Sequence, residues 1–232
     1  MFHDLTKSSG AEPSRSEQNA GQDIVVRLRS DITNNVFAPE AKLKFADLTK
    51  RYDLGVGTIR EALSQLISEG FVTLEAGKGF RVAPVSRAEL IEVTEHFLNF
   101  ERQAIAEAIR LGDDDWESRI VSAHHRLNII ESLPWAQRME RHGEWVQRHR
   151  EFHASLVSAC QQRWLLRLRA MMFDQLDRYR FLTKMAAEGQ GSSRADEHRQ
   201  IMEATLARDT TRAVALIENH IRATTEAGLS KF

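Results

Sequence analysis

Apolar positions recur every three or four residues near the start of the chain. One stripe runs from Ile24 to Val36, where Phe37-Ala38-Pro39 ends it, and a shorter stripe runs from about Phe45 to Tyr52. This spacing places apolar side chains on one face of a helix, so two helices are predicted here. Residues 1 to about 20 are polar and lack periodicity, which predicts a mobile tail.

The pattern then changes from helical spacing to alternation. Asp53-Leu54-Gly55 forms a predicted turn, a third helix follows over about 56–69, and Gly70 is suited to cap it. Residues 71–75 and 80–83 alternate between apolar and polar side chains, and Ala76-Gly77-Lys78-Gly79 joins them, which is typical of a β-hairpin. Helix, helix, turn, helix and hairpin is the order of a winged helix-turn-helix.

Everything after Pro84-Val85-Ser86, which we interpret as a hinge, has helical periodicity. Ser86 is placed to cap a new helix, with Glu89 three residues on as in a capping box. Helices are predicted near 87–111, 113–133, 136–160, 162–186, 194–207 and 209–227. The predicted fold class is therefore mainly α: a tail over 1–20, a winged helix-turn-helix over 21–84 and an all-helical antiparallel bundle over 85–232.

Composition restricts the class of protein more than its function. The 232 residues are 42% hydrophobic and 28% charged, as in an ordinary soluble protein. The single Cys160 cannot form an intramolecular disulfide, and no apolar run resembles a signal peptide or a membrane span, so a cytoplasmic location without a membrane partner is expected. Residues 20–84 carry nine Lys or Arg and eight Asp or Glu. A DNA-binding prediction must therefore rest on the pattern of residues, because the charge gives little support.

The third predicted helix has an outer face suited to DNA. Its outer positions include Thr58, Arg60 and Ser64, and an Arg is the side chain best suited to a bidentate contact with guanine. Thr58 and three lysines could bind phosphates and fix the register, the lysines being Lys44, Lys50 and Lys78. The alternative is an amphipathic helical hairpin with a solvated charged face.

The stretch LGVGTIREALSQLISEGFVTLEAGKGFRV resembles the DNA-binding signature of the GntR family. The run from Ile59 to Leu63, then Gly70-Phe71-Val72 and the wing residue Gly79 fall at the family spacing. The resemblance implies that Arg60 contacts a base and that Gly79 lets the wing tip approach the minor groove. Family members often have Arg where this chain has Ala46 and Val56, so the operator is expected to differ from the common half-site.

Four of the nine histidines are predicted to face inward. His149 and His153 stand four residues apart on one predicted helix, while His198 and His220 belong to the apolar stripes of the last two. Each could be a hydrogen-bonded core residue. Together they could instead bind one divalent ion, which would satisfy four imidazoles that are costly to bury without partners. The spacing alone leaves both interpretations open.

The C-terminal part resembles the FCD domain, the all-helical sensor of the FadR branch of the GntR family. Arg148-His-Arg-Glu-Phe-His153 is similar to the Asp-x-x-x-His ligand pair of that domain, with His149 where Asp is usual. His198 and His220 match the other two ligand positions. The resemblance therefore implies a metal site, and four nitrogen ligands favour Zn²⁺ or Ni²⁺ over Mn²⁺ or Mg²⁺.

In metal-binding FCD domains the ion commonly helps to hold a small carboxylate effector. Many relatives have Arg four residues before the Glu that corresponds to Glu101, but this chain has Phe97. Glu101, Arg178 and Tyr179 are the predicted effector-binding residues, although Arg178 could be a solvated surface residue. Three motifs taken together, LGVGTIREALSQL, RH-x-x-FH and FD-x-x-x-RYRF, are most similar to the carbon-starvation-induced regulator branch, whose members respond to glutarate. That resemblance implies a dicarboxylate effector.

Three functions can be compared on this basis. The first is a homodimeric repressor that binds an inverted repeat in double-stranded DNA and responds to a carboxylate. The second is a regulator for which the metal ion itself is the signal. The third is a metallo-hydrolase, but four nitrogen ligands leave little room for water and substrate, and no carboxylate is suitably spaced as a general base. The chain is therefore predicted not to be an enzyme.

Overall fold

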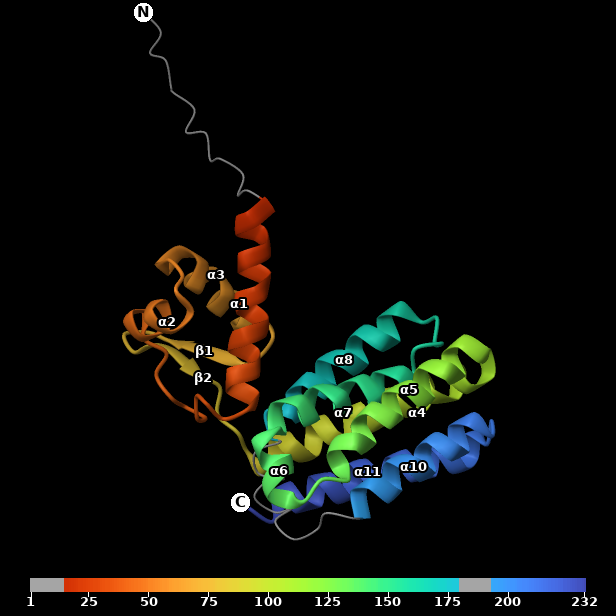
Figure 1. Cartoon of the computed structure of the whole chain (residues 1–232). Helices are drawn as coiled ribbons and strands as arrows, with labels where there is room; N and C mark the ends of the chain where they lie inside the picture. Colours follow the sequence, from red (N-terminus) through yellow and green to blue (C-terminus); the bar gives the residue numbers. More distant parts are fainter. Residues whose placement is uncertain (1–14, 180–192) are drawn as a thin grey trace, which may run out of the picture. The chain divides into compact units, whose positions relative to one another are not determined.

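The structure, a computed structural model, describes residues 15–179 and 193–232 (Figure 1). It divides into two compact units. The first extends to Ala83 and the second begins at Pro84, with residues 33–36 grouped with the second.

The N-terminal unit contains three helices and a two-stranded sheet. The helices are α1 (Arg15–Thr33), α2 (Phe45–Tyr52) and α3 (Val56–Ser68), and the strands are β1 (Val72–Glu75) and β2 (Gly79–Val82). The strands pair antiparallel, with Val72 opposite Val82. Helix α1 begins at Arg15, inside the segment predicted as a tail, which corrects that prediction for residues 15–20. Four of these six residues, Arg15, Glu17, Gln18 and Ala20, are good helix formers. The rest of the predicted tail, residues 1–14, lies outside the described residues.

The end of α3 fixes the entry into the hairpin. Gly70 has φ 79°, its amide donates to the Ile67 carbonyl at 3.0 Å, and the Phe71 amide donates to Leu66 at 2.9 Å. These two bonds form a Schellman motif, which requires a left-handed residue that Gly adopts without steric cost. The predicted cap at Gly70 is confirmed. Phe71 follows directly and is buried in the core of this unit.

In the C-terminal unit every described element is a helix. The helices are α4 (Arg87–Leu111), α5 (Asp114–Glu131), α6 (Trp135–Glu140), α7 (His142–Leu156), α8 (Arg163–Asp177), α10 (Ser193–Leu206) and α11 (Thr210–Leu229). Helix α8 packs on α4, α4 on α11, α11 on α10, α10 on α5 and α5 on α7. None of the helices that the structure describes is long and apolar enough to cross a membrane.

Two helix predictions in this unit need correction. The helix predicted over 136–160 is divided between α6 and α7, because Arg141 leaves helical geometry with φ −102° and ψ 23°. Gly143 follows as a weak helix former. Helix α7 ends at Leu156, and Val157 after it has φ −104° and ψ 3°. The helix predicted over 162–186 ends at Asp177, and its remainder from residue 180 lies outside the described residues.

The predicted capping box at the start of α4 forms only in part. Ser86 Oγ accepts a 3.1 Å bond from the Glu89 amide, as predicted. The Glu89 carboxylate does not return to Ser86, because it accepts hydrogen bonds from Arg178 and Tyr179 instead. The Ser86 amide donates to the Tyr179 hydroxyl at 3.4 Å. The start of the C-terminal unit is thus bonded to the end of α8.

Candidate metal centre

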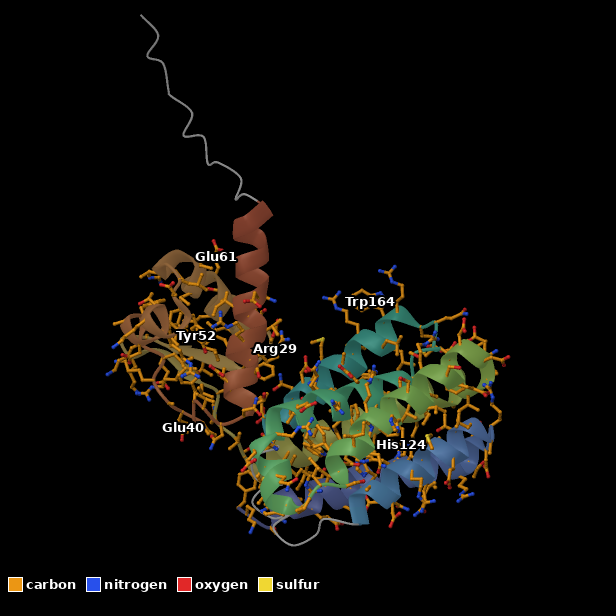
Figure 2. All side chains as sticks on the ribbon, viewed as in Figure 1. Arg29, Glu40, Tyr52, Glu61, His124 and Trp164 are labelled. Atoms are coloured by element: carbon orange, nitrogen blue, oxygen red, sulfur yellow. The ribbon has the colours of Figure 1, made fainter. Side chains whose placement is uncertain are left out.

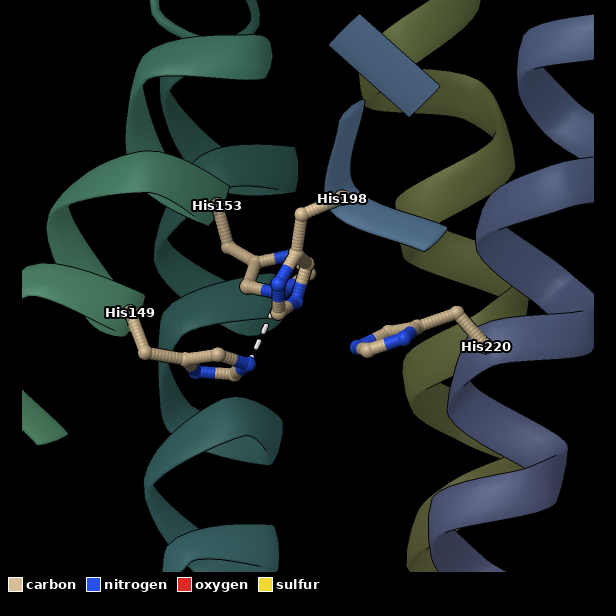
Figure 3. Close-up of side chains that lie close together, drawn as sticks. All are labelled: His149, His153, His198 and His220. Carbon is tan, nitrogen blue, oxygen red and sulfur yellow. Dashed lines mark hydrogen bonds between the residues drawn. The ribbon is translucent and has the colours of Figure 1, made fainter. Parts of the chain in front are cut away.

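Four histidine side chains from three helices meet inside the C-terminal unit. His149 and His153 project from successive turns of α7, His198 from α10 and His220 from α11 (Figure 3). Each is at most 8% exposed, which confirms that these histidines face inward. One ligand atom from each lies within 4.8 Å of those from the other three, and the Nε2 atoms of His149 and His153 are 3.1 Å apart. The fold therefore brings the whole predicted ligand set together.

Two carboxylates contact this cluster from behind. Nδ1 of His198 lies 3.0 Å from Glu131 Oε2, and Nδ1 of His220 lies 2.8 Å from Glu197 Oε2. Glu131 also accepts a 3.1 Å bond from Trp145 Nε1. Burial alone would raise the pKa of the Glu131 carboxyl, but the bond and the attraction from His198, with the bond from Trp145, outweigh burial and lower it. Glu131 can thus accept Nδ1–H of His198, and in the neutral imidazole Nε2 then carries the lone pair.

This donor set fits a divalent metal ion. Nε2 of His198 is buried and has no hydrogen-bond partner among the described residues, a state that costs about 1–3 kcal/mol when nothing satisfies the atom. Between the facing Nε2 atoms of His149 and His153 only one can donate. An ion about 2.0–2.1 Å from each nitrogen would satisfy all four lone pairs. The carboxylates of Glu131 and Glu197 would offset its double positive charge.

A pocket opens beside the histidines. His149, His153 and His220 form one part of its wall. The rest of the wall is mostly apolar and comes from several helices, with Phe97, Trp145, Phe173 and Ile221 among its largest side chains. A molecule in this pocket would reach the histidine nitrogens from one side.

Two of the three predicted effector-binding residues are held in ion pairs. Glu101 is fully buried and accepts two hydrogen bonds from the Arg169 guanidinium, the second at 3.1 Å. Arg178 is 4% exposed, so its interpretation as a solvated surface residue is wrong. Its guanidinium donates to Glu89 at 3.2 Å and to the Pro84 carbonyl.

Tyr179 is the one of the three that lines the pocket. Its hydroxyl donates to the Glu89 carboxylate. Burial, together with this hydrogen bond, raises the pKa of Tyr179, so the phenol stays protonated. Tyr179 therefore connects the pocket wall with Glu89 on the first turn of α4.

The predicted DNA-binding side chains lie on the N-terminal unit. Arg60 and Ser64 are exposed on α3, and Thr58 is half-buried at its first turn. The Arg60 guanidinium stacks 4.8 Å over the Phe45 ring and forms no ion pair with a described residue. The stacking orients this guanidinium without neutralising its charge. No side chain caps the start of α3 at Gly55, which leaves first-turn amides available for a phosphate.

The remaining predicted DNA contacts surround this helix in the sequence. Lys44 and Lys50 are exposed at either end of α2. Lys78 is exposed at the hairpin tip, with Nζ 2.8 Å from Glu75 Oε2. Gly79 has φ 82°, which other residues rarely adopt. Their contacts with DNA stay predictions.

Comparison with known proteins decides the family. Residues 20–82 match the model of bacterial regulatory proteins of the gntR family, and residues 92–223 match the FCD domain. The HTH-type transcriptional repressor GlaR of Escherichia coli (strain K12) is 38% identical over 198 residues, which are 84% of this chain and 89% of GlaR. The chain belongs to the GntR family. Its resemblance to the FCD branch is confirmed.

Other similar proteins agree with this assignment. The HTH-type transcriptional regulator BphR of Paraburkholderia xenovorans (strain LB400) is 34% identical over 84% of this chain and 79% of BphR. The structure of McbR from E. coli has a TM-score of 0.73 at 13% identity and covers 88% of this chain and 94% of its own. A GntR regulator from Rhodococcus sp. RHA1 has a TM-score of 0.75 at 19% identity, over 92% and 99%. These two structures support the fold, and the family makes the chain a DNA-binding transcriptional regulator and not an enzyme, as predicted.

Two residues around the histidines of this GntR protein, Glu131 and Arg169, could not be predicted from the sequence. Glu131 precedes His198 by 67 positions, and Arg169 follows Glu101 by 68. No local pattern relates residues so far apart. Glu197 offered a signal, since it stands beside His198, but its carboxylate contacts the histidine of the next helix.

Proposed function

We propose that this regulator represses transcription as a homodimer, and that a small carboxylate bound at a metal ion controls its affinity for operator DNA. The observation that carries the proposal is the buried, unpartnered Nε2 of His198 in a cluster of four histidines beside a pocket. FCD domains often bind metals, which supports the same conclusion. Repression is carried over from the name of GlaR.

In this proposal His149, His153, His198 and His220 hold the ion. Four nitrogen donors favour Zn²⁺ or Ni²⁺ over harder ions. When bound, the ion supplies a Lewis-acid centre for a carboxylate oxygen. His149, His153 and His220 also line the pocket, so the same nitrogens that hold the ion face the space for the effector. Resemblance to the glutarate-responsive branch makes glutarate or a similar dicarboxylate the first effector to test.

The predicted effector-binding residues take different parts in this proposal. Tyr179 contributes to the pocket wall directly. Arg178 links Glu89 to the Pro84 carbonyl, where the C-terminal unit begins. Glu101 fixes Arg169, whose guanidinium lies 5.5 Å over the ring of the pocket residue Phe97. Glu101 and Arg178 would thus hold the surroundings of the pocket.

DNA binding in this proposal uses two copies of α3. Arg60 reads a base, Thr58, Ser64, Lys44, Lys50 and Lys78 bind the backbone, and Gly79 lets the wing tip approach the minor groove. Two recognition helices related by a twofold axis read an inverted repeat with half-sites about 34 Å apart. Since DNA is the target, we place the regulator in the cytoplasm.

A second copy of the chain would cover the exposed apolar stripe on α8. Trp164 is 70% exposed and projects from this helix (Figure 2), and Leu168 and Met171 follow at helical spacing with 38% and 46% exposure. An inverted repeat also requires a twofold partner. Sedimentation of the wild type and Trp164→Glu tests this surface: a dimer that the substitution weakens supports it, and an unchanged dimer contradicts it.

The test of the proposed function is an operator-binding titration. An operator is first selected from random DNA, and its affinity for the full chain is measured with Zn²⁺, with chelator, and with Zn²⁺ plus a carboxylate. The carboxylate should change the affinity by about 5–150-fold, and only when Zn²⁺ is bound. A response to Zn²⁺ alone would make the ion the signal. No response to either would overturn the proposal.

A further inference from the structure

The hydroxyl and indole groups of the pocket wall already donate hydrogen bonds to other groups of the protein. Tyr179 donates to Glu89, and Thr224 donates to the His220 carbonyl at 2.9 Å. Trp145 donates to Glu131 at 3.1 Å. These groups therefore offer a ligand no free hydrogen-bond donor.

The same holds for Thr225, which lines the pocket beside α4. Its Oγ1 lies 3.0 Å from Oγ1 of Thr94, and Thr94 donates its own proton to the Leu90 carbonyl at 2.7 Å. Because each hydroxyl has one proton, Thr225 must donate to Thr94. The hydroxyl donor of Thr225 is thus also used inside the protein.

The charged residues of the wall also give little support for a second carboxylate on the ligand. No Lys or Arg occurs among the described residues that line the pocket, and its one acidic residue is Asp177. Asp177 is 2% exposed and paired with Arg150, a residue outside the lining. Away from the histidines, a second negative group on a ligand would therefore find no Lys or Arg among the described lining residues, and Asp177 already places a carboxylate in this lining.

The wall next to the histidines is instead aromatic. The Phe173 ring centroid lies 6.1 Å from that of His153 and 6.5 Å from that of His149. Phe97 continues this wall, 5.6 Å from Phe173. Trp145 packs on His149 from another side, with centroids 4.9 Å apart. A group attached to a metal-bound carboxylate would pass directly between these apolar faces.

We infer that the effector is a monocarboxylate with an apolar, preferably aromatic body. This inference rests on the proposed function, since the histidine-bound ion is what takes the carboxylate. At the far end of the pocket, binding of an apolar group gains free energy by covering apolar surface, whereas a second carboxylate there loses its hydration and finds no cationic partner among the described lining residues. Among the small carboxylates of the proposed function, this pocket favours monocarboxylates over glutarate, the dicarboxylate that the resemblance implies.

The experiment compares ligands that differ in one group. Pentanoate and glutarate share five carbons, and only glutarate carries a second carboxylate; 3-phenylpropanoate adds an aromatic body to a single carboxylate. Each is titrated by calorimetry into the Zn²⁺-loaded and the chelator-treated full chain at equal ionic strength. Pentanoate should bind at least about tenfold more tightly than glutarate, and 3-phenylpropanoate more tightly still.

The outcomes separate the inference from the proposed function. Glutarate binding as tightly as pentanoate overturns the monocarboxylate class and leaves the metal-dependent effector site standing. Binding of no carboxylate to the Zn²⁺-loaded chain overturns both. Carboxylate binding with the same affinity in the Zn²⁺-loaded and the chelator-treated chain contradicts the proposed function, and with it the inference that rests on that site.

Two substitutions of Phe97 test independently where the body of the ligand lies. Phe97 is 2% exposed in the wall, so Phe97→Arg places a cation where the wild-type pocket has an aromatic ring. This variant should reverse the preference in favour of glutarate, whereas Phe97→Leu should preserve the preference for pentanoate. If Phe97→Arg does not fold, the wild-type comparison still decides. A folded Phe97→Arg variant that prefers pentanoate as strongly as the wild type contradicts the assigned position of the ligand body.

Discussion

Replacing Glu131 by Gln should weaken metal binding without removing any proposed ligand. The wild-type carboxylate accepts from both His198 Nδ1 and Trp145 Nε1, at 3.0 and 3.1 Å. A Gln side chain has the same shape but only one carbonyl oxygen, so it can accept one of the two bonds and must turn its amide group to the other. If the amide faces His198, Nδ1 becomes the acceptor and the proton moves to Nε2. The nitrogen that should bind the ion is then blocked.

The expected loss is about 10–100-fold in Zn²⁺ affinity, the usual effect of removing a buried group that orients a ligand. At a free Zn²⁺ concentration of about 1,000 times the dissociation constant, the wild type gains about 4.1 kcal/mol, and a 100-fold weaker variant gains about 1.4 kcal/mol. That difference corresponds to about 5–10 °C less thermal stabilisation by Zn²⁺. Competition with a fluorescent chelator measures the affinity, and unfolding with and without Zn²⁺ measures the stabilisation.

Glu197→Gln is the matched control. Glu197 makes the equivalent contact with His220, but its side chain is 34% exposed, against 2% for Glu131. Water can replace part of this contact, so we expect a loss below about threefold. A Zn²⁺ affinity of Glu131→Gln within about twofold of the wild type would show that the Glu131 carboxylate does not orient His198 for the ion. A larger loss in Glu197→Gln than in Glu131→Gln would refute it too.

Further variants test the proposed metal ligand His149, the DNA contacts and Tyr179. His149→Asp should keep the fold and shift preference from Zn²⁺ toward Mn²⁺, while His149→Ala should weaken both; unchanged metal affinity in the Ala variant would show that His149 is not a ligand. Arg60→Ala should cost about 1–3 kcal/mol per half-site and relax one base pair, whereas Lys78→Ala should weaken all sequences alike. Selection from random DNA checks this, and an unchanged consensus for Arg60→Ala would exclude a base contact. Tyr179→Phe keeps the ring but loses the bond to Glu89, so carboxylate binding should persist while the operator response shrinks; a full response would exclude coupling through Glu89.

Local periodicity explains which parts of this structure could be predicted. Helix α2 spans Phe45–Tyr52 and α4 spans Arg87–Leu111, as the apolar stripes and caps indicated. The same periodicity identified the four histidines, because a side chain within a buried stripe must face the core. Helix ends and inward faces depend on neighbouring residues, and a single sequence contains that information.

Contacts between distant residues could not be predicted in this way. Glu89 stands at the capping-box position, yet its carboxylate contacts Tyr179, 90 residues on. Glu101 is predicted to bind an effector, and nothing in the sequence indicates that its carboxylate accepts from Arg169, 68 residues on. A carboxylate pairs with a donor that tertiary packing brings close to it, and the spacing of nearby residues in the sequence does not predict which donor that is. The pocket has the same origin, since its aromatic wall joins residues of α4, α7 and α8.

The most direct test of the central claim is the metal content of the chain. Protein purified without any chelator is analysed by mass spectrometry of its elements, beside His198→Ala prepared identically. We expect about one equivalent of zinc or nickel per wild-type chain and a clear loss in the variant, because the buried His198 Nε2 has no hydrogen-bond partner among the described residues and a metal ion would satisfy it. Less than about a tenth of an equivalent in the wild type would contradict the central claim.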